Sequence, residues 1–273
     1  MAAAMSSAPS PATAPRAGVG AAPQFEIRTI EVADVVDCIA QGVQDFGRAP
    51  IYGLFFGAVY AVGGLLLIWA SFALHYPYLA YPLVMAFALF APFGAAGTYE
   101  ISRRLDSGEP LSWAAVLGAV WTRAGKELAW LALVSIFTLI VWLYIAVLLF
   151  AVFYGPNSPS VQSVWQLVDE TLTTPPGVLF LIAGNGVGAI IALVVFSFTA
   201  FSPALVVDRD VDFVTAMATS LRAVAASPRA MLAWAIVIGA DLAISFATLF
   251  VALLVIFPVL GHVTWRLYRR AIV

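Results

Sequence analysis

Long, unbroken apolar runs constrain this chain more than any other feature of its sequence. Stretches such as Gly64–Ala73 and Leu139–Phe153 carry no charged residue, and over all 273 residues 63% are hydrophobic and only 10% are charged. A soluble domain carries about 25% charged residues, whereas a helix that crosses a bilayer needs ~20 mainly apolar residues. A membrane β-barrel would instead alternate in segments of ~10 residues. The sequence therefore predicts an all-α fold, a polytopic bundle of transmembrane helices.

The composition also argues against several functions. The formal charge of −2 and the pI near 5.6 do not provide the basic patch of a nucleic-acid-binding protein. The single cysteine, Cys38, excludes an intrachain disulfide, and His75 and His262 fall on opposite sides of the predicted membrane, so no metal site is expected. The run Gly184–Gly188 lacks the Lys-Ser/Thr that a phosphate loop needs. We find no catalytic motif and expect neither an enzyme activity nor a cofactor.

Hydropathy divides the chain into four clear spans and one longer apolar tract. The tract runs from Ala230 to about Trp265, and as one helix it would be ~54 Å long. A hydrocarbon core is only ~30 Å thick, so we expect two spans with a tight turn near Thr248–Val251. The four clear spans are predicted at Ile51–Leu74, Leu79–Thr98, Leu128–Tyr154 and Val178–Phe201.

Charge placement favours six spans over five. With six spans and the amino terminus inside, every Lys and Arg lies on one side of the membrane, as the positive-inside rule describes. Five spans would place Arg266, Arg269 and Arg270 outside. We therefore predict two cytoplasmic termini and, from the Arg- and Ala-rich composition, the inner membrane of a bacterium. Residues 1–24 are predicted to form a disordered Ala/Pro/Ser-rich tail, and residues 25–273 a single membrane domain.

A helical hairpin preceded by an amphipathic cytoplasmic segment occurs three times along the chain. These lead-in segments run from Val32 to Phe46, from Leu111 to Lys126 and from Asp212 to Val224, and Asp212 is expected to cap the third. Because each hairpin begins and ends in the cytoplasm, the repeats are parallel. We predict a pseudo-threefold bundle of six helices. The lead-in segments can lie on lipid headgroups or pack under the bundle.

A proline marks the second helix of each predicted hairpin. Pro92 and Pro258 are each followed, six and seven residues later, by a threonine and an aromatic residue, and then by arginine. Pro203 marks a degenerate third copy. Proline removes one backbone hydrogen bond, which neighbouring helices can compensate in a membrane. We therefore expect helix kinks at Pro92, Pro203 and Pro258, although the same pattern also fits the general composition of helix ends.

Four stretches of the chain resemble a known family. They are IYGLFFGAVYAVGGLLL at 51–67, APFGAAGTYEISRRLDSGEPLSW at 91–113, DRDVDFVTAMATSLRAV at 208–224 and FPVLGHVTWRLYRRAIV at 257–273. They are similar to the proteobacterial predicted integral membrane proteins grouped as domain of unknown function 2189, and the resemblance extends from about Ile27 to the carboxyl terminus. It implies a bacterial inner-membrane location and no particular activity.

Asp241 is the strongest candidate for a functional residue, because it is the only charged residue inside a predicted span. An ionisable group at this depth costs ~2.5–3.5 kcal/mol on insertion scales and usually faces a partner or a wet cavity. Residue counting places Asp241, Asn185, Tyr60 and Thr138 near the midplane, so we predict a buried polar layer. Asp241 fixes helix packing through a hydrogen bond, binds a proton or a substrate, or lies at a helix end or the outer boundary of the membrane.

For the other candidate residues we favour a structural interpretation over a functional one. His262, about one turn inside the cytoplasmic interface, either titrates near neutral pH or satisfies a carbonyl group freed by Pro258. The glycine pairs Gly53/Gly57 and Gly184/Gly188 have the spacing that lets helices approach closely. The external segment 155–177 is predicted to contain a short amphipathic helix.

Two functions of different class remain open. The scarcity of intramembrane polar residues and the amphipathic lead-in segments favour an accessory or scaffold membrane protein, with a membrane-protein partner or a second copy of the chain. Asp241, Asn185 and the prolines favour the alternative, a small transporter or channel-like permease, because broken helices and midplane polar groups mark transport sites. In both cases the protein is embedded in a lipid bilayer and binds no nucleic acid.

Overall fold

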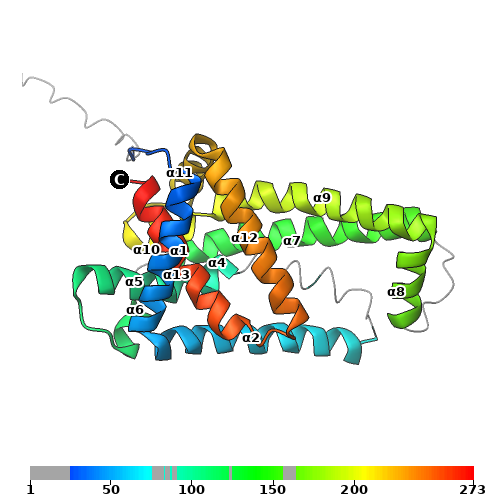
Figure 1. Ribbon diagram of the computed structural model, residues 1–273, viewed down its shortest axis with the longest axis horizontal. Helices are drawn as coiled ribbons and strands as arrows, with labels where there is room; N and C mark the ends of the chain where they lie inside the picture. Colours follow the sequence, from blue (N-terminus) through cyan, green and yellow to red (C-terminus); the bar gives the residue numbers. More distant parts are fainter. Residues whose placement is uncertain (1–24, 76–82, 84–86, 88–90, 123–124, 156–163) are drawn as a thin grey trace, which may run out of the picture.

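The structure is a computed structural model, and it describes residues 25–75, 83, 87, 91–122, 125–155 and 164–273. Within these residues the chain is helical, and a single antiparallel bridge joins Ile27 to Ile272. Figure 1 shows long helices that run side by side, away from a cluster of shorter helices at one end. The prediction of an all-α fold is confirmed. The predicted tail, residues 1–24, lies outside the described residues.

Four of the described helices are long and apolar enough to cross a membrane. Helix formation satisfies their backbone hydrogen bonds internally, which a bilayer interior requires. Three of them coincide with predicted spans and the fourth with the first half of the apolar tract, whereas the predicted span at 79–98 lies largely outside the described residues. The four are α2 (Pro50–Ala73), α7 (Gly125–Tyr154), α9 (Pro175–Thr199), which continues into α10 (Ser202–Asp208), and α12 (Pro228–Ala247).

Shorter helices coincide with the predicted lead-in segments: α1 (Val32–Arg48), α6 (Trp113–Thr122) and α11 (Phe213–Ala226). Asp212 caps α11, as predicted, because its carboxylate accepts hydrogen bonds from the backbone N–H and the hydroxyl of Thr215. Glu31 and Asp34 form a capping box at the start of α1. Helix α8 (Val164–Thr173) lies within the segment predicted to be external, at the end of the molecule opposite the short helices (Figure 1).

The prolines occupy different positions in their helices. Pro92 is the second residue of α4 (Ala91–Gly94), and Pro203 lies in the first turn of α10. The missing N–H of proline costs no helical hydrogen bond in a first turn. Pro258 lies inside α13 (Leu253–Ala271), where it leaves the carbonyl of Leu254 without its usual donor.

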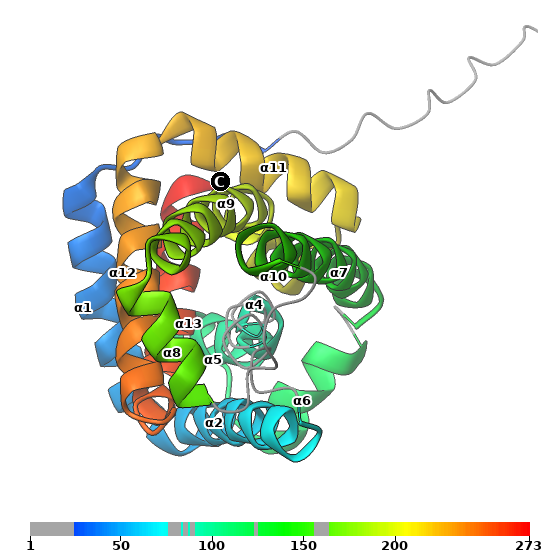
Figure 2. The ribbon, with the colours of Figure 1, turned by 90° about the vertical axis from the view of Figure 1, so that its right-hand side faces the viewer.

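At the short-helix end, three helices contact one another and each of them carries one outer helix. Helices α5 (Ala96–Ser107), α10 and α13 contact one another, α6 packs on α5, α11 packs on α10, and α1 packs on α13. The last contact joins the first described helix to the last one, and the Ile27–Ile272 bridge extends it. In the view along the long helices, α1, α6 and α11 lie at the rim of the bundle (Figure 2).

A turn at residues 248–252 divides the apolar tract at the predicted position. Leu249 and Phe250 adopt left-handed backbone conformations, with φ of 48° and 64°, and the Phe250 ring is completely buried against Gly64 of α2. Helix α13, which follows the turn, is not among the helices that have the length and hydropathy of a span. In the described residues these criteria therefore support four spans, and they do not confirm the six that we predicted.

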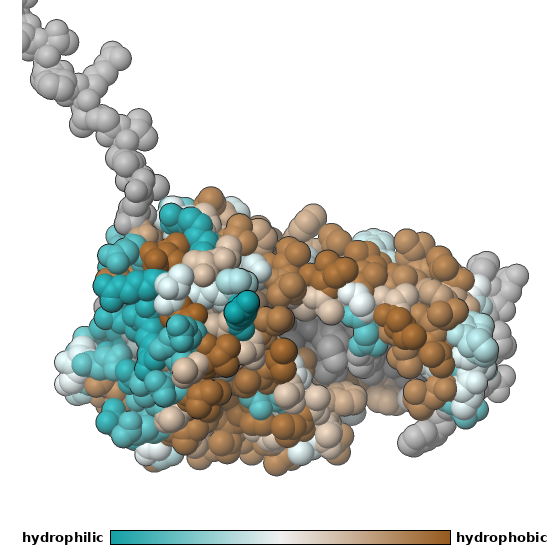
Figure 3. Space-filling view, turned by 45° about the horizontal axis from the view of Figure 1, so that its top comes forward, coloured by the Kyte–Doolittle hydropathy of each residue, from teal (hydrophilic) through white to brown (hydrophobic). Residues whose placement is uncertain are grey.

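The surface separates into a polar end and an apolar body. Figure 3 shows hydrophilic residues over the short helices and hydrophobic residues over the long ones. Apolar side chains such as Trp69, Phe137 and Ile182 are 68%, 67% and 66% exposed. In a soluble protein so much exposed apolar surface would be a liability, whereas in a membrane these side chains meet hydrocarbon.

Candidate functional site

The first candidate site is a cluster of paired polar side chains at the hydrophilic end, which we call the polar hub. It forms where α1, α5, α10 and α13 meet, and most of its members are buried. These members are Asp45, Glu100, Ser102, Asp106, Asp208, His262, Trp265, Arg266 and Tyr268.

Arg266 connects three helices of the hub. Its guanidinium donates to both carboxylate oxygens of Asp45 on α1, through Nε at 2.7 Å and Nη2 at 2.8 Å, and its Nη1 lies 2.6 Å from Oδ1 of Asp106 on α5. Asp45 is only 1% exposed. Burial raises the pKa of the Asp45 carboxyl, although Arg266 acts to lower it. Such a buried bidentate pair fixes helix geometry more reliably than it adds net stability.

Glu100 anchors the end of α5. Its carboxylate is completely buried and accepts hydrogen bonds from Arg103 Nε at 2.8 Å and Arg104 Nε at 2.7 Å. The chain leaves α5 through Gly108, in a left-handed conformation, so that Glu109 folds back and accepts from Arg103 at 2.9 and 3.0 Å. These hydrogen bonds lower the pKa of Glu109 to about 2. The charges of this turn are therefore paired with one another.

Asp208 ties α10 to α13. It accepts a hydrogen bond from the Tyr268 hydroxyl at 2.6 Å and one from Arg269 at 3.0 Å. Trp265, three residues before Tyr268, donates its indole N–H to Asp106 of α5 at 3.0 Å. The carboxyl half of α13 is thereby held by side chains of α5 on one side and of α10 on another.

His262 lies in the interior of the hub. Its Nδ1 is 2.7 Å from the Ser102 hydroxyl, and Ser102 Oγ lies 3.4 Å from Asp45. A Ser-His-Asp triad needs the carboxylate on the imidazole, but here the carboxylate contacts the serine. The Nε2 atom of His262 is buried and has no hydrogen-bond partner in the described part of the chain. His262 thus links α13 to α5, and no described contact connects it to the Leu254 carbonyl.

The two ends of the described chain are joined beside the hub. Arg270 of α13 pairs with Asp34 of α1, and the N–H of Ile30 donates to the hydroxyl of Ser227 at 2.9 Å. A hydrogen bond from the backbone N–H of Glu31 lowers the pKa of Asp34. These contacts hold α1 against both α13 and the start of α12.

The predicted polar layer is not brought together around Asp241. The Tyr60 hydroxyl donates to the carbonyl of Phe87 at 2.6 Å, and its ring stacks on Phe257. Thr138 donates to the carbonyl of Val134, and Asn185 to that of Leu181, each four residues earlier in its own helix. These polar groups are therefore satisfied by backbone carbonyls, and no described hydrogen bond links any of them to Asp241.

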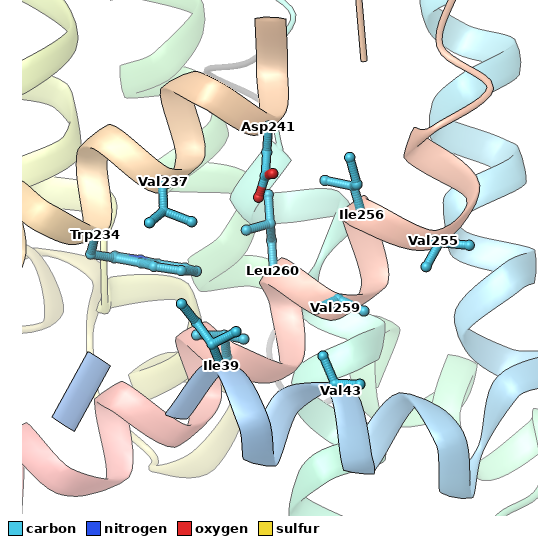
Figure 4. Close-up of a pocket in the computed structure, with 10 residues that line it drawn as sticks. Ile39, Val43, Trp234, Val237, Asp241, Val255, Ile256, Val259 and Leu260 are labelled. Atoms are coloured by element: carbon cyan, nitrogen blue, oxygen red, sulfur yellow. The ribbon is translucent and has the colours of Figure 1, made fainter. Parts of the chain in front are cut away.

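The second candidate site is a groove that contains Asp241. It lies between α1, α12 and α13, has a volume of about 320 Å³ and is lined mainly by aliphatic side chains. Figure 4 shows the Asp241 carboxylate directed from α12 toward α13, with Trp234 and Val237 on the same side of the groove as Asp241. Because Ile39 and Val43 of α1 line the same groove, Asp241 lies beside a lead-in helix.

Neither site offers a recognisable place for a metal ion. Within the described residues, no group of three or more His, Cys, Asp or Glu side chains is arranged to hold one. Cys38 is buried on α1, and burial raises the pKa of its thiol to about 11, so it is not a reactive thiolate.

The polar hub is the feature that sequence reasoning missed. On α1 three of the apolar side chains, Val32, Val36 and Val43, are turned outward, at 48%, 62% and 53% exposure. The buried face instead carries Val35, Cys38, Gly42 and Asp45. The available signal was the helical spacing of these small or polar residues, which places Asp45 on the same face as Gly42.

The fold and these sites define an integral membrane protein with several apolar helices and a polar hub at one end. A family model described as a predicted integral membrane protein, DUF2189, matches residues 80–208. This match confirms the family resemblance that the sequence indicated. No curated protein and no solved structure matches the chain.

Proposed function

We propose that the protein is an accessory or scaffold component of a membrane assembly and has no enzyme activity. The observation that supports this proposal is that the polar side chains of the protein do not gather around one cavity. The charged side chains of the hub are paired and largely buried, whereas Tyr60, Thr138 and Asn185 in the apolar body bond to backbone carbonyls. A transport path would instead need polar groups that face one cavity.

The proposed orientation places the polar hub and both termini in the cytoplasm of a bacterial inner membrane. The described basic residues lie at the hub end, in or beside the short helices or in the first turns of α7 and α12. The positive-inside rule assigns such an end to the cytoplasm.

We also propose that the three hairpins form a pseudo-threefold repeat. In support, α6 packs on the end of the first hairpin, α11 packs on the end of the second, and α1 packs on the end of the third. Helices α6 and α11 thus each pack on the hairpin that comes before them in sequence, and α1, which begins the series, packs on the last hairpin. This arrangement leaves one apolar side of α1 and α11 exposed at the rim, where a partner or lipid can bind.

A photo-crosslinking experiment tests the scaffold proposal. A photoreactive amino acid is placed at Val36 on α1, Trp121 on α6 or Val214 on α11, which are 62%, 80% and 58% exposed. Phe137 on α7, 67% exposed, serves as the matched lipid-facing control. We expect one protein adduct of fixed mass from at least one rim position and only lipid adducts from Phe137. Lipid adducts from all four positions would contradict a scaffold role.

A small transporter or permease is the second candidate function. The observation that favours it is Asp241, whose carboxylate lies in a groove and has no described side-chain partner. Proton and ion flux in proteoliposomes distinguishes the two functions, with Asp241→Asn as the test variant and Thr138→Val as the control. The scaffold proposal predicts flux equal to protein-free liposomes, whereas flux that only Asp241→Asn abolishes would establish transport.

A further inference from the structure

The carboxylate of Asp241 has no protein partner among the described residues. The one hydrogen bond at this position runs from the Ser245 hydroxyl to the Asp241 backbone carbonyl and does not involve the side chain. Within α12 Asp241 is the only acidic residue, and an ionisable group among apolar helices normally pairs with another group. A ligand that supplies a hydrogen-bond donor would complete this pairing.

The groove around Asp241 suits a hydrocarbon chain. Apart from Asp241, all its lining residues are apolar, and they come from three helices: Ile39, Val43, Trp234, Val237, Val255, Ile256, Val259, Leu260 and Val263. Its volume of about 320 Å³ lies at the lower end of the range for ligand pockets. Since α12 is one of the four candidate spans, a molecule dissolved in the bilayer can enter the groove from the side.

We propose that this groove binds a single-chain amphiphile with a cationic amine head. Charge complementarity selects this class, because an ammonium group offers hydrogen-bond donors and the opposite charge to the Asp241 carboxylate. The apolar walls accommodate the chain, whereas an anionic head would face an unpaired carboxylate. A divalent metal ion would need further oxygen ligands, which the lining does not supply. This binding site does not depend on the accessory role proposed above.

The test measures binding to the full-length protein in nanodiscs of phosphatidylcholine, with three probes that share one chain length: dodecylammonium, dodecanol and dodecanoate. Asp241→Asn is compared with the wild type, and Thr138→Val is the control, because Thr138 bonds within α7. We expect Asp241→Asn to weaken dodecylammonium binding at least tenfold and to leave dodecanol binding unchanged. Thr138→Val should change neither.

A second variant keeps the proposal testable if Asp241→Asn does not fold. Val259→Trp places a large ring in the groove, and we expect it to abolish the saturable binding of both dodecylammonium and dodecanol. Equal binding of dodecylammonium to the wild type and to Asp241→Asn would overturn the proposal. Dodecanoate binding as strong as dodecylammonium binding would do the same.

The turn between α12 and α13 lies beside the middle of α2 and does not reach the far end of that helix. Three glycines of α2 lie against α13 or the turn before it, as shown by the atoms that a Cβ added to each glycine would meet. At Gly53 it would lie 3.1 Å from Pro258, at Gly57 2.5 Å from the Leu254 carbonyl, and at Gly64 3.1 Å from the Phe250 ring. Helix α2 continues to Ala73, nine residues beyond Gly64, which corresponds to ~14 Å. The turn is therefore level with the interior of α2.

The backbone of this turn is satisfied internally. The N–H groups of residues 248–254 all have acceptors within the hairpin, including Phe250 N to Ser245 O at 2.7 Å and Ala252 N to the Thr248 hydroxyl at 3.2 Å. The exposed side chains of the turn are Thr248, whose hydroxyl bonds to backbone groups of the hairpin, and the apolar Leu249 and Val251, which are 66% and 63% exposed. Non-helical backbone within a bilayer requires such internal satisfaction, whereas a turn in water does not.

We infer that α12 and α13 form a re-entrant hairpin, which enters and leaves the membrane through the hub face without reaching the other side. This inference replaces the fifth and sixth predicted spans with a single insertion. Helix α12 has the length and hydropathy of a span, but in this arrangement it lies within the membrane without crossing it, and only α2, α7 and α9 of the four candidate helices cross. Both termini remain on the same side of the membrane, because a re-entrant hairpin, like two complete crossings, returns the chain to the side from which it entered.

Cysteine labelling tests this inference in a Cys38→Ser background. Leu249→Cys reports on the turn, Lys126→Cys on the hub side and Asp169→Cys on α8, and all three positions are exposed. With an impermeant maleimide, we expect each control to react from one side only and Leu249→Cys to react from neither side until detergent is added. Labelling of Leu249→Cys at the rate and from the side of Asp169→Cys would overturn the inference.

Discussion

The contact between α2 and the α12–α13 hairpin leads to a quantitative prediction for Gly57. A Cβ atom at this position would lie 2.5 Å from the Leu254 carbonyl oxygen and 2.8 Å from that of Leu253, whereas ordinary contact begins at 3.4 Å. Both obstacles are backbone atoms, so neither can rotate away. The Leu254 carbonyl is also the one that Pro258 leaves without a donor, and the absence of a side chain at Gly57 lets α2 approach it.

Gly57→Ala should therefore destabilise the protein by ~1–3 kcal/mol, the usual cost of overpacking. Gly184→Ala is the matched control, because Gly184 belongs to a motif of the same spacing but a Cβ added there would meet nothing within 4 Å. There alanine should be neutral or should stabilise α9 by up to ~1 kcal/mol through its higher helix propensity.

The assay is reversible unfolding in mixed micelles by increasing SDS, followed by tryptophan fluorescence. Gly57→Ala should be less stable than Gly184→Ala by ~1–4 kcal/mol. If Gly57→Ala were as stable as the wild type, or if Gly184→Ala lost as much stability, the packing of the hairpin on α2 would be refuted.

Three further predictions concern the polar hub and its surroundings. Arg266→Met should destabilise the fold by ~3–5 kcal/mol, because Asp45 would remain buried without its bidentate partner and with only the exposed Arg48, 3.7 Å away, to pair with it. An unfolding midpoint equal to that of the wild type would contradict this. Burial raises the folded-state pKa of Asp45 above its ordinary value of 3.8, so the stability of the wild type relative to Asp45→Asn should be greatest below pH 3.8 and should decline as the pH rises through the raised pKa. Thermal unfolding at a series of pH values measures that difference, and a difference that grew with pH would have the wrong sign. Asp212→Ala removes the cap of α11 and should cost ~1 kcal/mol, whereas Asp212→Asn, which can still cap, should cost less in the same assay.

Much of the fold could be predicted from the sequence because span position depends on local composition. The apolar runs locate α2, α7 and α9 to within a few residues, and the Asp212 cap follows from residues three apart in sequence. Hydropathy does not report how deeply a helix pair inserts, since tilt and depth depend on packing against neighbours. For this reason the contacts of Gly57 and Gly64 were needed to place the α12–α13 turn.

The polar hub could not be predicted, because its pairs are distant in sequence. Asp45, Asp106 and Arg266 come from three different helices, and Asp45 and Arg266 are 221 residues apart. Taken alone, each of these residues would be predicted to be an ordinary surface charge near the end of a helix. Only the packing of α1 on α13 brings Asp45 to Arg266 and leaves Val32, Val36 and Val43 of α1 exposed.

The contact between α1 and α13, the first and last described helices, holds the polar hub together and supports the proposed repeat. Ile27 and Ile272 face each other as a non-hydrogen-bonded antiparallel pair, flanked by the bonds Arg28 N to Ala271 O and Val273 N to Glu26 O. The Cα atoms of such a pair lie ~4.5 Å apart, within the range of a disulfide.

The most direct measurement is disulfide formation in an Ile27→Cys/Ile272→Cys double variant, made in the Cys38→Ser background and oxidised in native membranes. Contact between the segments that contain Ile27 and Ile272 predicts a near-complete disulfide within one molecule, detected by mass spectrometry, and none in either single variant. Free thiols after oxidation, or disulfides only between two molecules, would contradict this contact.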